Sequence, residues 1–335
     1  MRATAPAPTR RRFLAGSALG ATLLMLGSAV AQTAYPSRTI RVVVPFPAGG
    51  TTDLIARLFA QRMSEGLGQS IVIENVGGAG GSVGADTVAK AEPDGYTLLF
   101  HNLTFSSTTA SLQFAGRAKH DLADFAPISL AVNVPMLLVA NPSVPAKDLK
   151  DFAVYAKEAG AKQPLFYGST GPGSIMNLAA EVFKRDSGIA MDHVPFRGAA
   201  PLVQELLAGR IQFGGDQLST ALPHVASGAL KPLAVLAERR STILPDVPTV
   251  RELGFPNMEL RGWNGFFGPA RPPEAVVARL NQEIARAAQH PEIRRRLAEL
   301  GAEPVGSTPA ELGQAVREQI EKVRPLVSEL KLIVQ

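Results

Sequence analysis

Apolar residues along this chain form short β-branched runs that alternate with segments of helical periodicity. The run at 40–44, Ile-Arg-Val-Val-Val, ends at Pro45 and is typical of a buried strand. Residues 53–63 follow with apolar side chains at helical spacing, and further strands are predicted at 71–75 and 96–100. Because strands and helices alternate, the pattern predicts an α/β fold with a largely parallel sheet.

The middle of the chain repeats this pattern, and the last third is mostly helical. The predicted strands of the middle region are 136–140, 165–167, 193–196, 211–213 and 233–236. Two units of strand, glycine-rich loop and helix stand out, one near Gly49 and one near Gly171. Two α/β lobes facing each other across a cleft would place both loops at the carboxyl ends of strands, where open parallel sheets bind ligands.

The composition indicates a globular protein of two ordinary domains. The 335 residues are 46% hydrophobic and 19% charged, which excludes a disordered chain. There is no cysteine, so disulfides, thiolate metal sites and a cysteine nucleophile are excluded. The net charge of +5 includes +4 from arginines before Gln32, where no acid occurs, and this leaves +1 for the rest. A role in binding nucleic acid therefore loses its electrostatic basis.

The N-terminal residues 1–31 are predicted to be a signal peptide. Arg11-Arg12 precede a short apolar run over 14–30, which ends in the small-x-small sequence Ala29-Val30-Ala31. The paired arginines favour a twin-arginine export signal, with an ordinary secretory signal and an uncleaved membrane anchor as alternatives. We expect cleavage near Ala31 and a mature protein in the periplasm.

The loop 46–52 is the first candidate binding site. Its glycines let backbone amides approach a ligand closely, and the amides at the start of the following helix lack internal partners. Such a site suits a carboxylate or phosphate, and the hydroxyls of Thr51 and Thr52 add donors. An ordinary strand-to-helix turn is the alternative interpretation. The second loop, 168–174, repeats the arrangement without a Walker lysine, so a carboxylate is favoured over a nucleoside triphosphate.

The third glycine-rich loop, 77–84, offers an enzymatic alternative. It lacks a dinucleotide fingerprint because Val83 stands where a glycine is required, but Gly80 to Gly84 match G-x-S-x-G. An exported serine hydrolase using Ser82 is therefore the competing hypothesis. A nucleophile elbow needs its serine directly after a strand, whereas the strand here ends near Asn75, so a flexible loop is favoured.

Other polar and aromatic residues have less specific interpretations. His193 is expected to form hydrogen bonds rather than to catalyse, and no clustered His, Asp or Glu predicts a metal or a cofactor. Phe46, Phe196 and Trp263 are candidates for apolar walls around a ligand, with packing as the alternative, which is favoured for Trp263. Asp216 is either an acceptor that faces the ligand or a helix cap.

Several motifs in order along the chain resemble the Bug family, the extracytoplasmic solute receptors of tripartite tricarboxylate transport systems. The similarity runs from about Tyr35 to Pro325. The motifs that carry it are Pro45-Phe46-Pro47-Ala48-Gly49-Gly50-Thr51-Thr52-Asp53, Glu74-Asn75, Pro93-Asp94-Gly95-Tyr96, Tyr167-Gly168-Ser169-Thr170-Gly171-Pro172-Gly173-Ser174, Val194-Pro195-Phe196-Arg197-Gly198 and Pro245-Asp246-Val247-Pro248-Thr249.

The resemblance implies a fold like that of the type II periplasmic binding proteins, with two α/β lobes, a ligand cleft and two crossover segments. It places 32–132 and 253–335 in lobe 1 and 133–252 in lobe 2. It also implies a monomer that binds a small carboxylate for integral-membrane transporter subunits, without breaking a bond. The implied ligand contacts are Phe46, Ala48, Gly49, Thr51, Thr52, Ser169, Thr170, Gly171, Phe196, Gly198, Ala199 and Asp216. No contact is assigned to 77–84, where Val76-Gly77 and Ser82 depart from the usual family residues.

Overall fold

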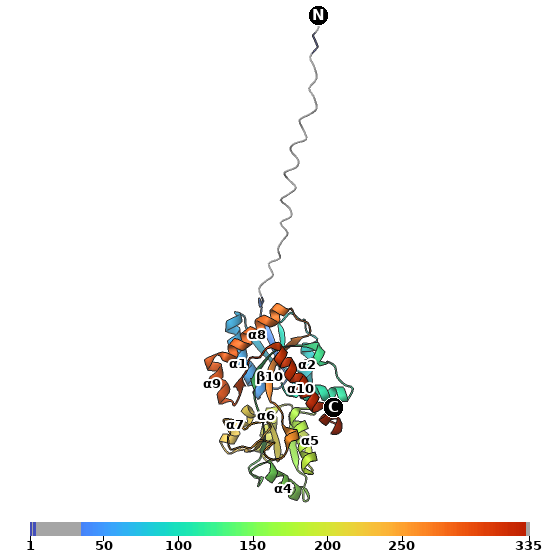
Figure 1. Cartoon of the computed structure of the whole chain (residues 1–335), viewed down its shortest axis with the longest axis vertical. Coiled ribbons are helices and arrows are strands. Elements are labelled where there is room, and N and C mark those ends of the chain that lie inside the picture. The colour runs from blue at the N-terminus through green and yellow to red at the C-terminus, as the bar shows by residue number, and fades with distance from the viewer. Residues whose placement is uncertain (2, 5–34, 333–335) are drawn as a thin grey trace.

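The computed structural model describes residues 1, 3–4 and 35–332, and it contains two sheets with helices around each (Figure 1). The predicted signal peptide and its cleavage site lie almost entirely outside these residues. Within the described part of the chain, no helix combines the length and the apolar character needed to cross a membrane.

The first sheet has six strands in the order β11-β4-β10-β3-β1-β2. Its strands are β1 Ile40–Val44, β2 Ile71–Asn75, β3 Thr97–Asn102, β4 Phe125–Asn133, β10 Trp263–Pro269 and β11 Glu303–Pro304. Its helices are α1 Thr51–Leu67, α2 Ser82–Ala89, α3 Thr104–Phe114, α8 Glu274–Gln289, α9 Pro291–Glu299 and α10 Pro309–Glu329, with short 3₁₀ turns at η1 Ala79–Gly81 and η2 Leu122–Asp124.

The second sheet has five strands in the order β7-β6-β8-β5-β9. Its strands are β5 Met136–Ala140, β6 Phe166–Ser169, β7 Asp192–Pro195, β8 Phe213–Gln217 and β9 Lys231–Val235. The helices around it are α4 Leu149–Gly160, α5 Ile175–Ser187, α6 Ala199–Leu207 and α7 Leu218–Ala226, and the 3₁₀ turn η3 Pro256–Met258 contacts α5.

The expectation of a largely parallel sheet is wrong, because both sheets are mixed. Strand β1 runs parallel to β2 and β3, and β6 runs parallel to β7 and β8. Strand β10 instead runs antiparallel between β3 and β4, and β5 runs antiparallel to β8 and β9. Strands β5 and β10 lie next to the points where the chain passes from one sheet to the other. They are not joined to their neighbours by β-α-β units, which would have made them parallel.

The chain crosses between the two sheets twice, as expected. It leaves the first sheet at Asn133, enters the second at Met136 and returns between Val235 and Trp263. Buried apolar side chains continue across the crossing, since one cluster joins Leu99 and Phe105 of the first lobe to the second sheet. The two lobes are therefore packed against each other. The exact lobe boundaries at 133 and 252 stay a prediction.

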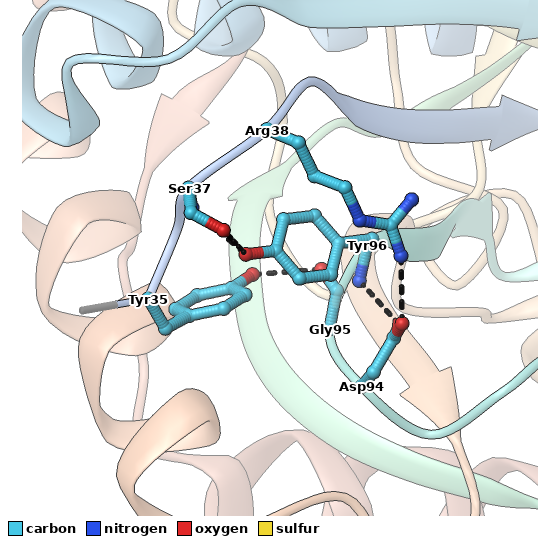
Figure 2. A network of polar contacts seen from close by, with 6 residues as sticks. All are labelled: Tyr35, Ser37, Arg38, Asp94, Gly95 and Tyr96. Carbon is cyan, nitrogen blue, oxygen red and sulfur yellow. Dashed lines mark hydrogen bonds and ion pairs between the residues drawn. The ribbon is translucent and has the colours of Figure 1, made fainter. Parts of the chain in front are cut away.

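The start of the described chain is anchored to the turn before β3 (Figure 2). The Tyr35 hydroxyl donates to the carbonyl of Gly95 at 2.7 Å, and the Ser37 amide donates to the Tyr96 hydroxyl at 2.8 Å. The Arg38 guanidinium lies 4.0 Å from the centre of the Tyr96 ring and pairs with Asp94 at 2.8 Å. These contacts hold the segment before β1 along the edge of the first lobe.

Candidate ligand-binding site

A cavity of about 490 Å³ opens between the lobes at the carboxyl ends of strands β1, β2, β6 and β7. The position is the one that the strand-and-loop pattern predicts for a ligand. The residues that line it are Pro45, Phe46, Gly77, Gly78, Ala79, Gly80, Gly81, Thr170, Gly171, Pro172, Pro195, Phe196 and Arg197.

Asp53 fixes the shape of the first loop. This buried carboxylate accepts hydrogen bonds from the Gly49 amide at 3.0 Å and the Asn75 side chain at 2.9 Å, and it pairs with Arg57 at 2.9 Å. Burial alone would raise the pKa of Asp53, but the bonds from Arg57, Gly49 and Asn75 outweigh it and hold the pKa below its usual value. The Gly49 amide, expected to face the ligand, therefore holds the loop instead.

The amides next to Gly49 remain available. Among the described residues, no acceptor is bonded to the backbone N–H of Gly50, Thr52 or Asp53. These groups belong to the first turn of α1, where the helix dipole is positive. The helix end thus keeps free donors even though one of its amides is occupied.

The two threonine hydroxyls are engaged in contacts within the protein. The hydroxyls of Thr51 and Thr220 lie 2.7 Å apart, and the Thr51 amide also donates to Thr220 at 3.2 Å. The Thr52 hydroxyl accepts from the side-chain amides of Asn102 at 3.1 Å and Asn264 at 3.2 Å. Thr51 therefore connects the first lobe to α7 of the second, and Thr52 ties α1 to β3 and β10.

The second loop is built in the same way around a buried serine. The Ser169 hydroxyl lies 2.6 Å from Nε2 of His193 and exchanges bonds with the carbonyl and amide of Gly171, at 3.0 and 3.2 Å. Burial lowers the pKa of His193, whose ring stacks on Tyr167 at 4.9 Å between centroids. His193 is thus a hydrogen-bonding residue, as expected. Thr170 lines the cavity, and within the described chain its hydroxyl has no protein partner.

The loops of the two lobes confront each other at close range. A side chain at Gly198 would place its Cβ 2.7 Å from Cδ of Pro47, and one at Gly171 would lie 3.4 Å from the Gly80 amide nitrogen. Distances under 3.0 Å are essentially never seen for real Cβ atoms, so Gly198 permits the approach that the cleft requires. Ala199 then begins α6, which has no side-chain cap.

Asp216 lies beside this contact and not in the cavity lining. Its carboxylate accepts from the Thr220 hydroxyl at 3.1 Å. Burial raises the pKa of Asp216 to about 6, against the lowering effect of bonds from Gln217 and Thr220. It accepts from a side chain within α7, but that helix has no side-chain cap, so the structure does not support the helix-cap interpretation, and a role in ligand binding stays a prediction.

The expected contact residues thus divide into two groups. Phe46, Thr170, Gly171 and Phe196 line the cavity. The others surround it without lining it: Ala48, Gly49, Thr51, Thr52, Ser169, Gly198, Ala199 and Asp216. Which of the twelve bind a ligand stays a prediction.

Three features near the site escaped the sequence analysis. Residues 77–81 form one wall, and a Cβ at Gly80 would lie 2.9 Å from the Thr108 hydroxyl and 3.1 Å from the Pro172 carbonyl. Arg197 lines the mouth, and Thr220 connects the lobes. The run of glycines in 77–81 was a signal from which this wall of the cavity could have been predicted. Nothing in the local sequence pointed to Thr220.

Ser82 has no catalytic partner in the described chain. It is the buried first residue of α2, and no histidine is bonded to it. His101 lies near, since a Cβ at Gly81 would be 2.8 Å from its Nε2. Burial and the neighbouring His120 lower the pKa of His101 to about 3, so the ring is neutral, and its Nδ1 accepts from the Asn102 amide. The described residues also hold no group of three or more potential metal ligands.

Trp263 packs in the core, which is the interpretation that the sequence analysis favoured over a role in the ligand site. Its side chain is fully buried at the start of β10, and the indole N–H donates to Gln319 at 2.6 Å. A larger cavity of about 740 Å³ lies beside it, between both crossover segments and α10, but neither glycine-rich ligand loop lines it. The chemistry of the two loops therefore belongs to the smaller cavity.

Residues 55–332 match the family model described as "Tripartite tricarboxylate transporter family receptor". The chain belongs to this family. It is 32% identical over 304 residues to protein BugT of Bordetella pertussis, covering 91% of this chain and 93% of BugT. The resemblance to the Bug family is thereby confirmed.

Solved structures agree with the receptor fold. MatC of Rhodopseudomonas palustris, solved with bound malate, is 36% identical with a TM-score of 0.81, covering 88% of this chain and 100% of MatC. A second protein of R. palustris, solved with adipate, is 34% identical with a TM-score of 0.82, covering 89% of this chain and 99% of its own. The expected periplasmic-binding-protein fold of two α/β lobes is confirmed.

Proposed function

We propose that this receptor captures a small carboxylate in the periplasm by closing its lobes and delivers it, as a monomer, to integral-membrane transporter subunits. The signal peptide would be removed near Ala31. The observation that carries the proposal is the charge of the cavity between the lobes. Among its described lining residues none is acidic, and the polar groups come from the backbone and from the side chains of Thr170 and Arg197.

Such a lining suits an organic acid. Gly78, Ala79 and Gly80 line the cavity with amides that bond to no acceptor within the described chain, and Phe46 and Phe196 provide apolar surface for the carbon chain of the acid. The binding of malate and adipate by solved relatives supports the same class of ligand. We place no catalytic step at the site, because within the described chain no histidine is hydrogen-bonded to Ser82 and Nδ1 of the neighbouring His101 already accepts from the Asn102 amide.

Binding of the ligand would favour the closed arrangement of the lobes. The first loop already meets the second lobe in this structure, through the contact of Thr51 with Thr220 in α7 and the approach of Gly198 to Pro47. A ligand that touches both loops stabilises the closed arrangement by contacts that the open one lacks.

The test is a thermal-shift and calorimetry screen of the mature protein against carboxylates, with malate and adipate included. A ligand at about 100 times its Kd stabilises the native state by about 2.7 kcal/mol, which is a clear rise in melting temperature. Uncharged dimethyl esters of the same acids are the control and should produce no rise. If no acid of the panel raises the melting temperature or gives a binding heat, the proposal fails.

A further inference from the structure

Arg197 is the one described cavity-lining residue that has a charged side chain. It is exposed at the mouth, and no acidic side chain of the described chain pairs with it. Every other polar contribution to the lining comes from backbone groups or from Thr170. An unpaired arginine in the lining of a cavity without acids provides a positive charge that a ligand can neutralise.

The backbone around Arg197 is held in place on both sides. The amide of the preceding Phe196 donates to the Ser169 carbonyl at 2.9 Å, and the following Gly198 lies against Pro47 of the other lobe. Arg197 therefore stands at a fixed point of the mouth, while Gly78, Ala79 and Gly80 line the same cavity from the first lobe, and their amides bond to no acceptor within the described chain. A ligand that reaches both needs acidic groups at its two ends.

We propose that Arg197 binds the second carboxylate of the ligand and thereby makes this protein a receptor that prefers dicarboxylates over monocarboxylates of the same length. The inference rests on the proposed carboxylate-binding function. Arginine suits the task because its planar fork of donors matches the two oxygens of a carboxylate. Its partial exposure limits the gain, since an exposed ion pair is screened by salt.

The experiment compares matched ligand pairs on matched variants. Adipate and hexanoate share a six-carbon chain and differ in one carboxylate, and malate and 3-hydroxybutyrate form a shorter pair. Calorimetry would measure both pairs on the wild type, on Arg197→Gln and on Arg197→Lys. Arg239→Gln is the control, because Arg239 is exposed and does not line this cavity.

We expect Arg197→Gln to weaken binding of the dicarboxylate by about threefold to tenfold, with Arg197→Lys retaining part of the affinity. Binding of the monocarboxylate should change by less than about twofold, and added salt should weaken dicarboxylate binding more in the wild type than in Arg197→Gln. Arg239→Gln should behave as the wild type in every arm.

The outcomes separate the two proposals. If the wild type binds monocarboxylates as tightly as dicarboxylates, or if Arg197→Gln weakens both ligands of a pair equally, the role of Arg197 is overturned while carboxylate binding stands. If the wild type binds no acid at all, the proposed function fails and this inference fails with it. Equal melting temperatures of the variants exclude a folding defect.

Discussion

Thr220 gives the sharpest test of how the lobes are held together. Its hydroxyl donates to Asp216 at 3.1 Å, so the 2.7 Å contact with Thr51 requires the Thr51 hydroxyl to be the donor. The Thr51 amide donates to the same oxygen at 3.2 Å. Thr220→Val keeps the shape of the side chain and removes both bonds between the lobes.

The expected size follows from these two bonds. A net contribution of about 0.5–1.5 kcal/mol for each gives roughly 1–3 kcal/mol for the pair. Because only the closed arrangement binds the ligand tightly, losing this energy in a free protein that is mostly open reduces the closed fraction, and the apparent Kd then rises by the same factor. We therefore expect the Kd for the tightest acid of the panel to rise about 5-fold to 150-fold.

Calorimetry measures this Kd, and small-angle scattering with and without ligand measures the closure. Thr220→Ser keeps the hydroxyl and should bind nearly as the wild type. Thr87→Val is the matched control, since the Thr87 hydroxyl bonds to Val83 within its own helix. A Thr220→Val protein that binds within twofold of the wild type and closes equally would refute a role for this contact.

Three further changes test the geometry around the cleft. Gly198→Val should prevent full closure by contact with Pro47 and abolish measurable binding in calorimetry, while an unchanged Kd would show that the approach is dispensable. Ser169→Ala should release the Gly171 amide and weaken binding by about 1–3 kcal/mol without a comparable loss of Tm, which differential scanning calorimetry can separate. Burial raises the native pKa of the Asp216 carboxyl from 3.8 to about 6, so the native state binds the carboxyl proton more tightly than the unfolded chain does. The free energy of unfolding therefore falls as the pH rises from about 4 to about 6. Asp216→Asn should therefore melt at a higher temperature than the wild type at about pH 8, with the difference vanishing near about pH 4; the opposite order would contradict the raised pKa.

The sequence predicted best those elements whose side chains follow a simple pattern. Strands β1, β2 and β5 are short β-branched or aliphatic runs, and the structure places them where the runs lie. Helix α1 buries Ile55, Phe59 and Met63 of its expected apolar face, whereas Leu54 is exposed. The helix ends at Gly68 in a left-handed conformation that glycine adopts without strain. The apolar pattern predicts these segments because each face of the element lies either in the core or toward solvent.

The missed elements are those without such a contrast. Helix α3 reads Thr-Phe-Ser-Ser-Thr-Thr-Ala-Ser, and Ser107, Thr108 and Ser111 are all buried, so the helix has no polar face to reveal it. The hydroxyls of Ser107, Thr108 and Ser111 bond to backbone carbonyls, as that of Thr108 does to Gly80 at 3.0 Å. Strand β10 is buried along its whole length, and its asparagine and two glycines obscured it.

The location of the site was predictable, but the free donors were not. Strand order and glycine loops place the cleft, because the carboxyl ends of strands from both sheets meet there. Whether a given amide faces the ligand depends on distant partners. Thr51 meets Thr220, which lies 169 positions away, and Ser169 meets His193 at a separation of 24. No local pattern contains this information.

The same partners explain how the receptor can discriminate between ligands. The polar side chains expected to bind the acid, those of Thr51, Thr52 and Ser169, are occupied in shaping the loops. Backbone amides then remain for the ligand, and they recognise an anionic group without reading the rest of the molecule. Discrimination between acids must therefore arise from the few side chains that reach the cavity, among them the two phenylalanines, Thr170 and Arg197. Exchanges at these positions should change which acid is bound, whereas exchanges in the loop framework should weaken all acids together.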